Sequence, residues 1–209
     1  MPRRPAPALS RGHARMLQLR IVLRDIEPPI WRCVAVPEDY TFWDLHVAIQ
    51  DAMGWRDYHL HEFEVTDPSH GQLVRVGIPD DEFPNERPTL PGWRIPIAPY
   101  LAREGAAAIY RYDFGDGWEH TVTFEGSRMA ATRSSRKPLC IGGERTCPPE
   151  DVGGVLGFAE FLEAIATPAH AEHAAMRRWV GRRYDPWLFA AEKVRFDDPE
   201  KRWRRAFGR

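Results

Sequence analysis

The 209-residue chain is 43% hydrophobic and contains eight tryptophans and ten phenylalanines, which suits a packed domain and excludes a disordered protein. No stretch approaches the roughly 18 uninterrupted apolar residues of a membrane-spanning helix, so we expect no membrane contact. The net charge of −1 conceals basic ends, because residues 1–24 carry +6 and residues 172–209 carry +5 around a body of −12.

The basic ends are candidates for contact with nucleic-acid phosphates, although the acidic body of the chain would repel those phosphates. We favour the alternative that these ends are solvated or fold back onto the body. The N-terminal segment lacks the apolar core of a signal peptide, and three cysteines do not indicate a disulfide framework. We therefore expect a cytoplasmic protein with a flexible basic tail at 1–15, one domain at 16–190 and a basic C-terminal tail at 191–209.

The domain opens with a β-β-α-β order. Alternating apolar and polar residues predict a strand at 16–24, which pairs with a second β-rich run at 30–36. Thr41 is the predicted N-cap of a helix that ends at Gly54. His46 lies beside the apolar face of this helix, and we expect it to be a hydrogen-bonded residue at the edge of the core.

Two further strands are predicted at 59–66 and 72–78, and the proline-rich residues 79–99 are expected to form a long loop. The stretch YRYDFGDGWEH at 110–120 predicts a β-hairpin with a tight turn at Gly115-Asp116-Gly117. Alternation assigns one set of its side chains to the core, namely Tyr110, Tyr112, Phe114, Trp118, His120, Val122 and Phe124.

The C-terminal part combines loops and helices. Residues 126–137 are polar without periodicity, and the many glycines and prolines of 138–154 predict an irregular loop. Helices are predicted at 157–166 and 169–181. The pattern as a whole predicts a single α+β domain with a mixed or mostly antiparallel sheet and C-terminal helices.

Several segments form a recognisable set, namely PPIWRCVAVP at 28–37, DAMGW at 51–55, HLHEFEV at 59–65, YDFGDGWEH at 112–120 and CIGGERTCPPEDVGG at 140–154. Together they resemble the plasmid pRiA4b ORF-3-like family, sometimes labelled as transposon or insertion-sequence passenger proteins. The resemblance implies an α+β domain associated with mobile elements, without a particular biochemical activity. Members usually carry a third cysteine where this chain has Val152, which weakens any metal site built from three thiolates.

Acidic and aromatic residues are dense at the hairpin tip and in the CPPED segment, and we predict a ligand-binding surface made of both. Its candidate residues are Asp113, Asp116, Trp118, Glu119, His120, Glu150 and Asp151. Carboxylates are the ligands that magnesium and manganese prefer, so a divalent metal is the candidate cofactor. Against such a site, aspartate beside glycine is ordinary turn chemistry, and the acids of the CPPED segment could cap the following helix.

A thiolate site is a second candidate. Cys140 and Cys147 are separated by six residues, wider than the spacing of common zinc knuckles. Because Val152 replaces the third cysteine, a histidine or carboxylate such as His120 or Asp151 would have to complete the metal shell. We favour cysteines that are buried or unpaired.

The chain contains no G-x-S-x-G elbow, H-E-x-x-H pair, P-loop or dinucleotide-binding motif, and no catalytic residue is assigned. The sequence therefore favours a non-enzymatic binding or accessory module, associated with mobile DNA. A metal-dependent hydrolase or nuclease that uses the acidic hairpin tip and the CPPED segment is the first alternative. A protein–protein adaptor is the second.

Overall fold

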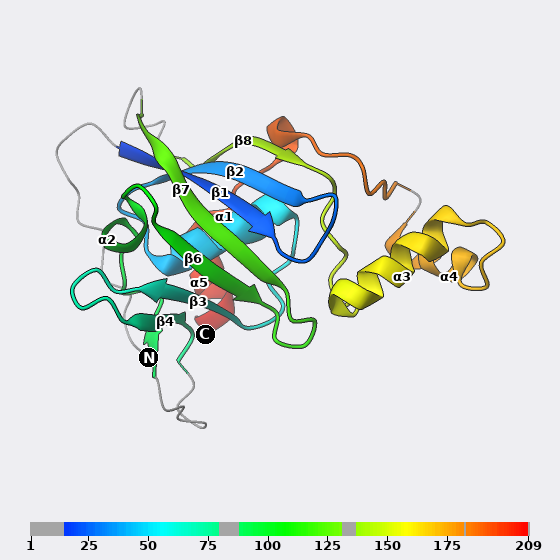
Figure 1. The fold of residues 1–209 in the computed structure, drawn as a ribbon, viewed down its shortest axis with the longest axis horizontal. Helices are drawn as coiled ribbons and strands as arrows, with labels where there is room; N and C mark the ends of the chain where they lie inside the picture. The colour runs from blue at the N-terminus through cyan, green and yellow to red at the C-terminus, as the bar shows by residue number, and fades with distance from the viewer. Residues whose placement is uncertain (1–14, 80–87, 131–136, 182, 209) are drawn as a thin grey trace.

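The fold is organised around one mixed sheet of eight strands (Figure 1). The computed structural model describes residues 15–79, 88–130, 137–181 and 183–208. The strands are β1 (Arg15–Leu23), β2 (Ile30–Pro37), β3 (His61–Thr66), β4 (Leu73–Gly77), β5 (Thr89–Pro91), β6 (Ala107–Tyr112), β7 (Glu119–Met129) and β8 (Leu139–Glu144). They lie in the order β5-β4-β3-β6-β7-β1-β2-β8, and only the β4–β5 pair is parallel.

The predicted α+β class is confirmed, and so is the opening hairpin. β1 pairs antiparallel with β2 on one side and with β7 on the other. Period-two alternation places one row of β1 side chains under the helix layer, and all of them are at most 1% exposed: Leu17, Leu19, Ile21 and Leu23.

Helix α1 (Phe42–Met53) packs on one face of the sheet and closes the core. Thr41 and Asp44 form a capping box at its start, and Gly54 ends it in the left-handed conformation with φ 87°. His46 is fully buried and hydrogen-bonded through both ring nitrogens. The predicted helix and the predicted role of His46 are both confirmed.

The remaining helices are α2 (Ala98–Leu101), α3 (Gly154–Ala166), α4 (His173–Val180) and α5 (Pro199–Phe207), with a 3-10 turn η2 (Ala191–Lys193). Helices α3 and α4 pack on each other beside the sheet (Figure 1). The segment predicted as a basic C-terminal tail contains η2 and α5. Trp203 and Phe207 of α5 pack on Trp43 of α1, with ring centroids 5.2 and 5.5 Å apart. None of the described helices has the length and apolar character needed to cross a membrane.

Three loop predictions are wrong in part. Residues 139–144 form β8 rather than irregular structure, because their backbone groups pair with the edge of β2. Gly143 suits the contact, since a Cβ there would lie 2.7 Å from the carbonyl oxygen of Trp31. β7 continues into the predicted loop as far as Met129, and the predicted loop at 79–99 contains β5 and the start of α2.

Phe114 departs from the predicted alternation. It is 57% exposed, because the strand ends at Tyr112 and the chain turns away from the core. Parts of two predicted loops, residues 80–87 and 131–136, and most of the predicted N-terminal tail lie outside the described residues.

Candidate metal centre

Three chain segments that are distant in sequence meet at one end of the β6–β7 hairpin. They are the loop 54–60 between α1 and β3, the hairpin tip 113–118, and the CPPED loop 147–153. Asp116 at the tip accepts hydrogen bonds from the Gly153 backbone N–H, with both carboxylate oxygens at 3.2 Å. The tip and the CPPED loop are therefore in direct contact.

Backbone packing makes this contact close. Gly154 has φ +69°, and a Cβ at this position would lie 2.3 Å from the backbone oxygen of Asp116. Only glycine combines this conformation with so near an approach. The glycine pair that closes the CPPED loop thus allows α3 to begin directly against the hairpin tip.

The loop 54–60 is joined to the CPPED loop through Glu150. Its Oε1 accepts hydrogen bonds from the Tyr112 hydroxyl at 2.6 Å and from the Arg56 backbone N–H at 3.0 Å. The Tyr112 oxygen in turn accepts the Tyr58 N–H at 3.1 Å. Burial and the adjacent Glu150 carboxylate raise the pKa of Tyr112, so this hydroxyl stays protonated and can donate. One phenol therefore links all three segments.

The convergence brings together one imidazole and two carboxylates. His59 Nε2 lies 3.0 Å from Asp151 Oδ1 and 3.8 Å from Asp113 Oδ2, and the three ligand atoms are all within 4.8 Å of one another. Nε2 is shielded from solvent, and its contact with Asp151 has the distance of an ion pair without the geometry of a hydrogen bond. The three side chains border a pocket of about 280 Å³, with Phe114 and Leu60 also in its wall.

The spacing suits a metal ion. Bonds of about 2.1 Å place ligand atoms about 3.0 Å apart at right angles and about 3.4 Å apart in a tetrahedron. The distances from His59 Nε2, 3.0 and 3.8 Å, lie on either side of the tetrahedral value. Asp113 is only 4% exposed, and its Oδ1 accepts the Asp116 N–H at 2.7 Å, so Oδ2 is the oxygen that faces His59. Asp151 is the exposed member of the set.

A second group of histidine and aspartate side chains consists of His46, Asp57 and His61, of which the two histidines are buried. Its two imidazole rings are stacked, with centroids 3.4 Å apart and planes inclined by only 7°. A metal binds an imidazole nitrogen in the ring plane, and one ion cannot lie in two parallel planes at this separation. This group is therefore a packed polar cluster and a poor metal site.

Three predicted site residues lie elsewhere. Trp118 is 2% exposed and packs in the core, where its ring faces Trp55 at 6.4 Å. Glu119 points away from the pocket and forms ion pairs with Arg24 at 2.6 Å and Arg111 at 2.8 Å. The opposite orientations of Trp118 and Glu119 follow from the alternation of side chains along the strand beyond the tip.

His120 also belongs to the core. It is fully buried, its Nδ1 lies 3.3 Å from the Tyr110 carbonyl oxygen, and burial lowers its pKa to about 3. The predicted surface is thus reduced to Asp113, Asp116, Glu150 and Asp151. Asp116 and Glu150 are used to join the loops, while Asp113 and Asp151 face His59.

The two candidate cysteines do not join the aspartates. Cys147 Sγ lies 3.1 Å from the sulfur of Met53 and accepts a hydrogen bond from Arg32 at 3.4 Å. Cys140 Sγ contacts the Gly142 carbonyl oxygen at 3.6 Å. Burial raises the pKa of both thiols, and within the described ranges neither belongs to a group of three metal-ligating side chains.

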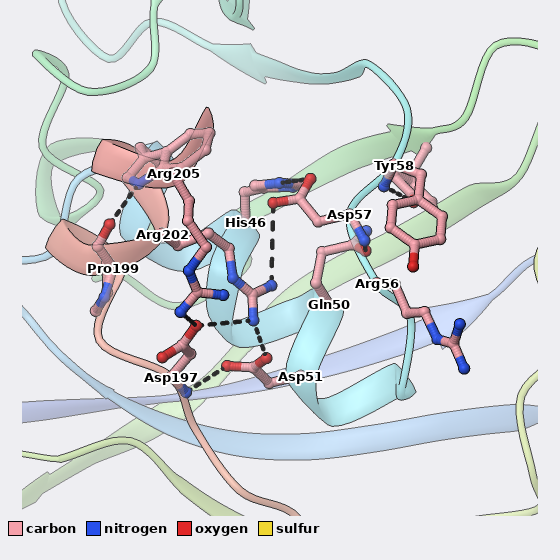
Figure 2. Close-up of polar contacts among 12 residues, drawn as sticks. His46, Gln50, Asp51, Arg56, Asp57, Tyr58, Asp197, Pro199, Arg202 and Arg205 are labelled. Atoms are coloured by element: carbon pink, nitrogen blue, oxygen red, sulfur yellow. Dashed lines mark hydrogen bonds and ion pairs between the residues drawn. The ribbon is translucent and has the colours of Figure 1, made fainter. Parts of the chain in front are cut away.

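A partly buried ionic cluster connects α5 to the loop that carries His59 (Figure 2). Arg202 of α5 lies between Asp51, Asp57 and Asp197, at 2.6, 3.9 and 3.5 Å respectively. Burial raises the pKa of Asp51, because desolvation outweighs the effect of the guanidinium. Arginine rather than lysine suits this position, since its planar group reaches several acceptors at once.

Comparison with known proteins agrees with the resemblance read from the motifs. Residues 15–193 match the family described as plasmid pRiA4b ORF-3-like protein. The chain belongs to this family. "Uncharacterized protein y4hQ" of Sinorhizobium fredii is 36% identical over 196 residues, which covers 92% of this chain and 96% of the relative. The crystal structure of MM3350, a protein of unknown function from Methanosarcina mazei Go1, superposes with a TM-score of 0.80 at 37% identity and covers 88% of this chain and 100% of that one.

His59 of this pRiA4b ORF-3-like protein was not among the site residues predicted from the sequence. It lies in HLHEFEV, one of the family motifs, but before β3 rather than inside it. The useful signal was its position between a helix C-cap and a strand, where a loop side chain is free to turn toward another loop. Nothing local indicated that Asp113 and Asp151 would lie opposite.

Proposed function

We propose that this protein is a binding module for a divalent cation, held by His59, Asp113 and Asp151. The observation that carries the proposal is the convergence of His59 Nε2, a nitrogen shielded from solvent, with carboxylate oxygens of Asp151 at 3.0 Å and Asp113 at 3.8 Å. A cation bound between the three side chains would take this nitrogen as a ligand and compensate the charge of the buried Asp113.

The donor set indicates the class of ion. One imidazole nitrogen and two carboxylate oxygens suit zinc or manganese better than calcium, which takes oxygen ligands alone. Three protein ligands leave coordination positions for water or a ligand of the module. The exposed Asp151 is on the side from which such a ligand would enter.

Titration calorimetry with Zn²⁺ and with Mn²⁺ on protein dialysed against a chelator and then against chelator-free buffer tests the proposal. We expect one ion per chain and a loss of affinity of at least tenfold in Asp113→Asn and in His59→Ala. Glu119→Gln is the matched control, because Glu119 lies on the same hairpin but points to Arg24 and Arg111. No binding at millimolar ion, or equal affinity in Asp113→Asn, refutes the proposal.

A metal-dependent hydrolase is the second candidate, and the incomplete protein coordination favours it, since catalytic ions need a position for water. Hydrolysis of a phosphodiester that requires the added ion and is lost in Asp113→Asn would support this reading. Retention of that activity in the variant would assign it to a contaminant.

The positive charge of the C-terminal segment suggests association with nucleic acid, but the contacts of its arginines give this proposal little support. Arg202, Arg204 and Arg205 all form ion pairs with acids of the same chain. Arg177 donates hydrogen bonds to the backbone oxygens of Ile165 and Tyr184. These four cations already have partners within the chain, so a phosphate backbone would have to compete with those partners.

A further inference from the structure

The loop that carries His59 is held in place by residues that do not line the pocket of the cation site. Asp57, two residues before His59, has a positive φ of 61°, a conformation that is uncommon for residues other than glycine. The surrounding contacts compensate for it. The Asp57 N–H donates to Gln50 Oε1 at 3.2 Å, and Asp57 Oδ1 lies 2.8 Å from His46 Nε2.

The second carboxylate oxygen of Asp57 faces α5. Arg202 Nη1 lies 3.9 Å from Asp57 Oδ2, while Nη2 binds Asp51 at 2.6 Å (Figure 2). Nη1 is buried and has no hydrogen-bond partner, so its role toward Asp57 is that of a nearby positive charge. The side chains of Asp51 and Asp57 are only 8% and 11% exposed. If Arg202 were removed, these two carboxylates would lie near each other without the positive charge of its guanidinium.

We infer that Arg202 is a positioning residue for the cation site, acting through Asp57. The inference rests on the proposed function of His59, Asp113 and Asp151. With Arg202 in place, the Asp57 carboxylate stays inside the fold and the backbone that leads to His59 keeps its left-handed turn. Without Arg202, Asp57 turns toward solvent, the turn relaxes, and His59 moves away from the two aspartates.

The inference concerns a part of the chain outside the family match. That match ends at residue 193, whereas α5 begins at Pro199. α5 is held by the rings of Trp203 and Phe207 on α1, and by a hydrogen bond from Trp43 Nε1 to the Pro199 carbonyl oxygen at 3.0 Å. α5 therefore couples the state of the C-terminal segment to a site formed by the family domain.

The direction in which cation affinity changes on removal of the Arg202 charge distinguishes positioning from a direct electrostatic effect. Removal of a positive charge near a cation site strengthens cation binding by Coulomb's law alone. Positioning predicts the opposite, a weaker site. A fall in affinity after loss of the Arg202 charge therefore cannot be a direct charge effect.

The experiment measures Zn²⁺ and Co²⁺ affinity of the full chain in Arg202→Met, Arg202→Lys and Arg204→Met. Arg204 is the matched control on the same helix, because it is 74% exposed and pairs with Glu200. We expect at least fivefold weaker binding in Arg202→Met, partial recovery in Arg202→Lys, and wild-type affinity in Arg204→Met. The visible spectrum of bound Co²⁺ reports the geometry of the ligands, so it should change most in Arg202→Met, less in Arg202→Lys and not in Arg204→Met.

A second variant covers the case in which Arg202→Met does not fold. Asp51→Asn combined with Arg202→Met removes the carboxylate that the arginine binds most closely, and we expect the same loss of affinity. Unchanged or stronger binding in folded Arg202→Met, alone or combined with Asp51→Asn, overturns the inference and leaves the cation site intact. Absence of binding in the wild-type chain overturns the proposed function and the inference together.

Discussion

His120 is the candidate site residue whose environment makes the sharpest prediction about stability. It lies fully buried in β7, and burial lowers its pKa to about 3, against about 6.5 in an unfolded chain. Between these two pH values, His120 is therefore protonated in the unfolded chain and neutral in the folded protein. Because the folded state has the lower pKa, the contribution of His120 to the free energy of unfolding is fully present above pH 6.5 and is lost as the pH falls toward 3.

The size of the effect follows from the two pKa values. Each pH unit within the window changes the free energy of unfolding by about 1.4 kcal/mol. Lowering the pH from 7 to 4.5 therefore costs roughly 2.5 kcal/mol through His120 alone, after the small cost already present at pH 7. That is a large fraction of the stability of an ordinary domain.

Urea unfolding at pH 7 and pH 4.5 tests this value in His120→Asn, which keeps an N–H donor near the Tyr110 carbonyl but does not titrate in this range. Wild type should lose roughly 2.5 kcal/mol more than the variant between the two pH values. Val122→Ala is the control, since Val122 is also fully buried in β7 and has no titrating group. It should be less stable at both pH values and keep the pH dependence of wild type.

Equal pH dependence in His120→Asn and wild type would refute the reasoning. It would mean that the folded protein accepts a proton on His120, and the description of this residue as a neutral core residue would fail. The contribution of His61, whose pKa burial also lowers, is common to both proteins and cancels in the comparison.

Two other features give predictions of their own. Gly154→Ala should destabilise the protein by roughly 2–4 kcal/mol, because a Cβ at φ +69° would collide with the Asp116 carbonyl. In urea unfolding, a loss of stability below about 0.5 kcal/mol would contradict the close packing of the two loops. The three free cysteines should react slowly with a thiol reagent at pH 8 until the chain is unfolded. Burial raises the pKa of Cys140 and Cys147, and burial together with the Glu125 carboxylate raises the pKa of Cys33 to about 12. A fast native phase of one or more equivalents would show that a thiolate is accessible.

Much of the fold is determined by local patterns in the sequence. Alternation in 16–24 is sufficient for β1, because a strand with one buried face needs apolar residues at every second position. The Thr41 cap and Gly54 define both ends of α1 through hydrogen bonds and a backbone conformation that those residues themselves supply. The hairpin around Gly115-Asp116-Gly117 follows from the same kind of local chemistry.

Long-range packing decided the rest. Residues 139–144 became β8 because the edge of β2 offered unpaired backbone groups, which no property of the segment itself revealed. Phe114 is exposed although the alternation of the hairpin assigned it to the core, because the strand ends before it. In both cases a neighbouring element or a chain turn overruled the periodicity.

The sequence by itself determined an α+β domain, its family and the two acidic loops that carry Asp113 and Asp151. Only the tertiary structure brought His59 to those aspartates and placed Arg202 behind the loop that carries it. The reason is physical: hydrogen-bond periodicity and capping act over a few residues, whereas a site of three ligands from three loops depends on how distant segments pack.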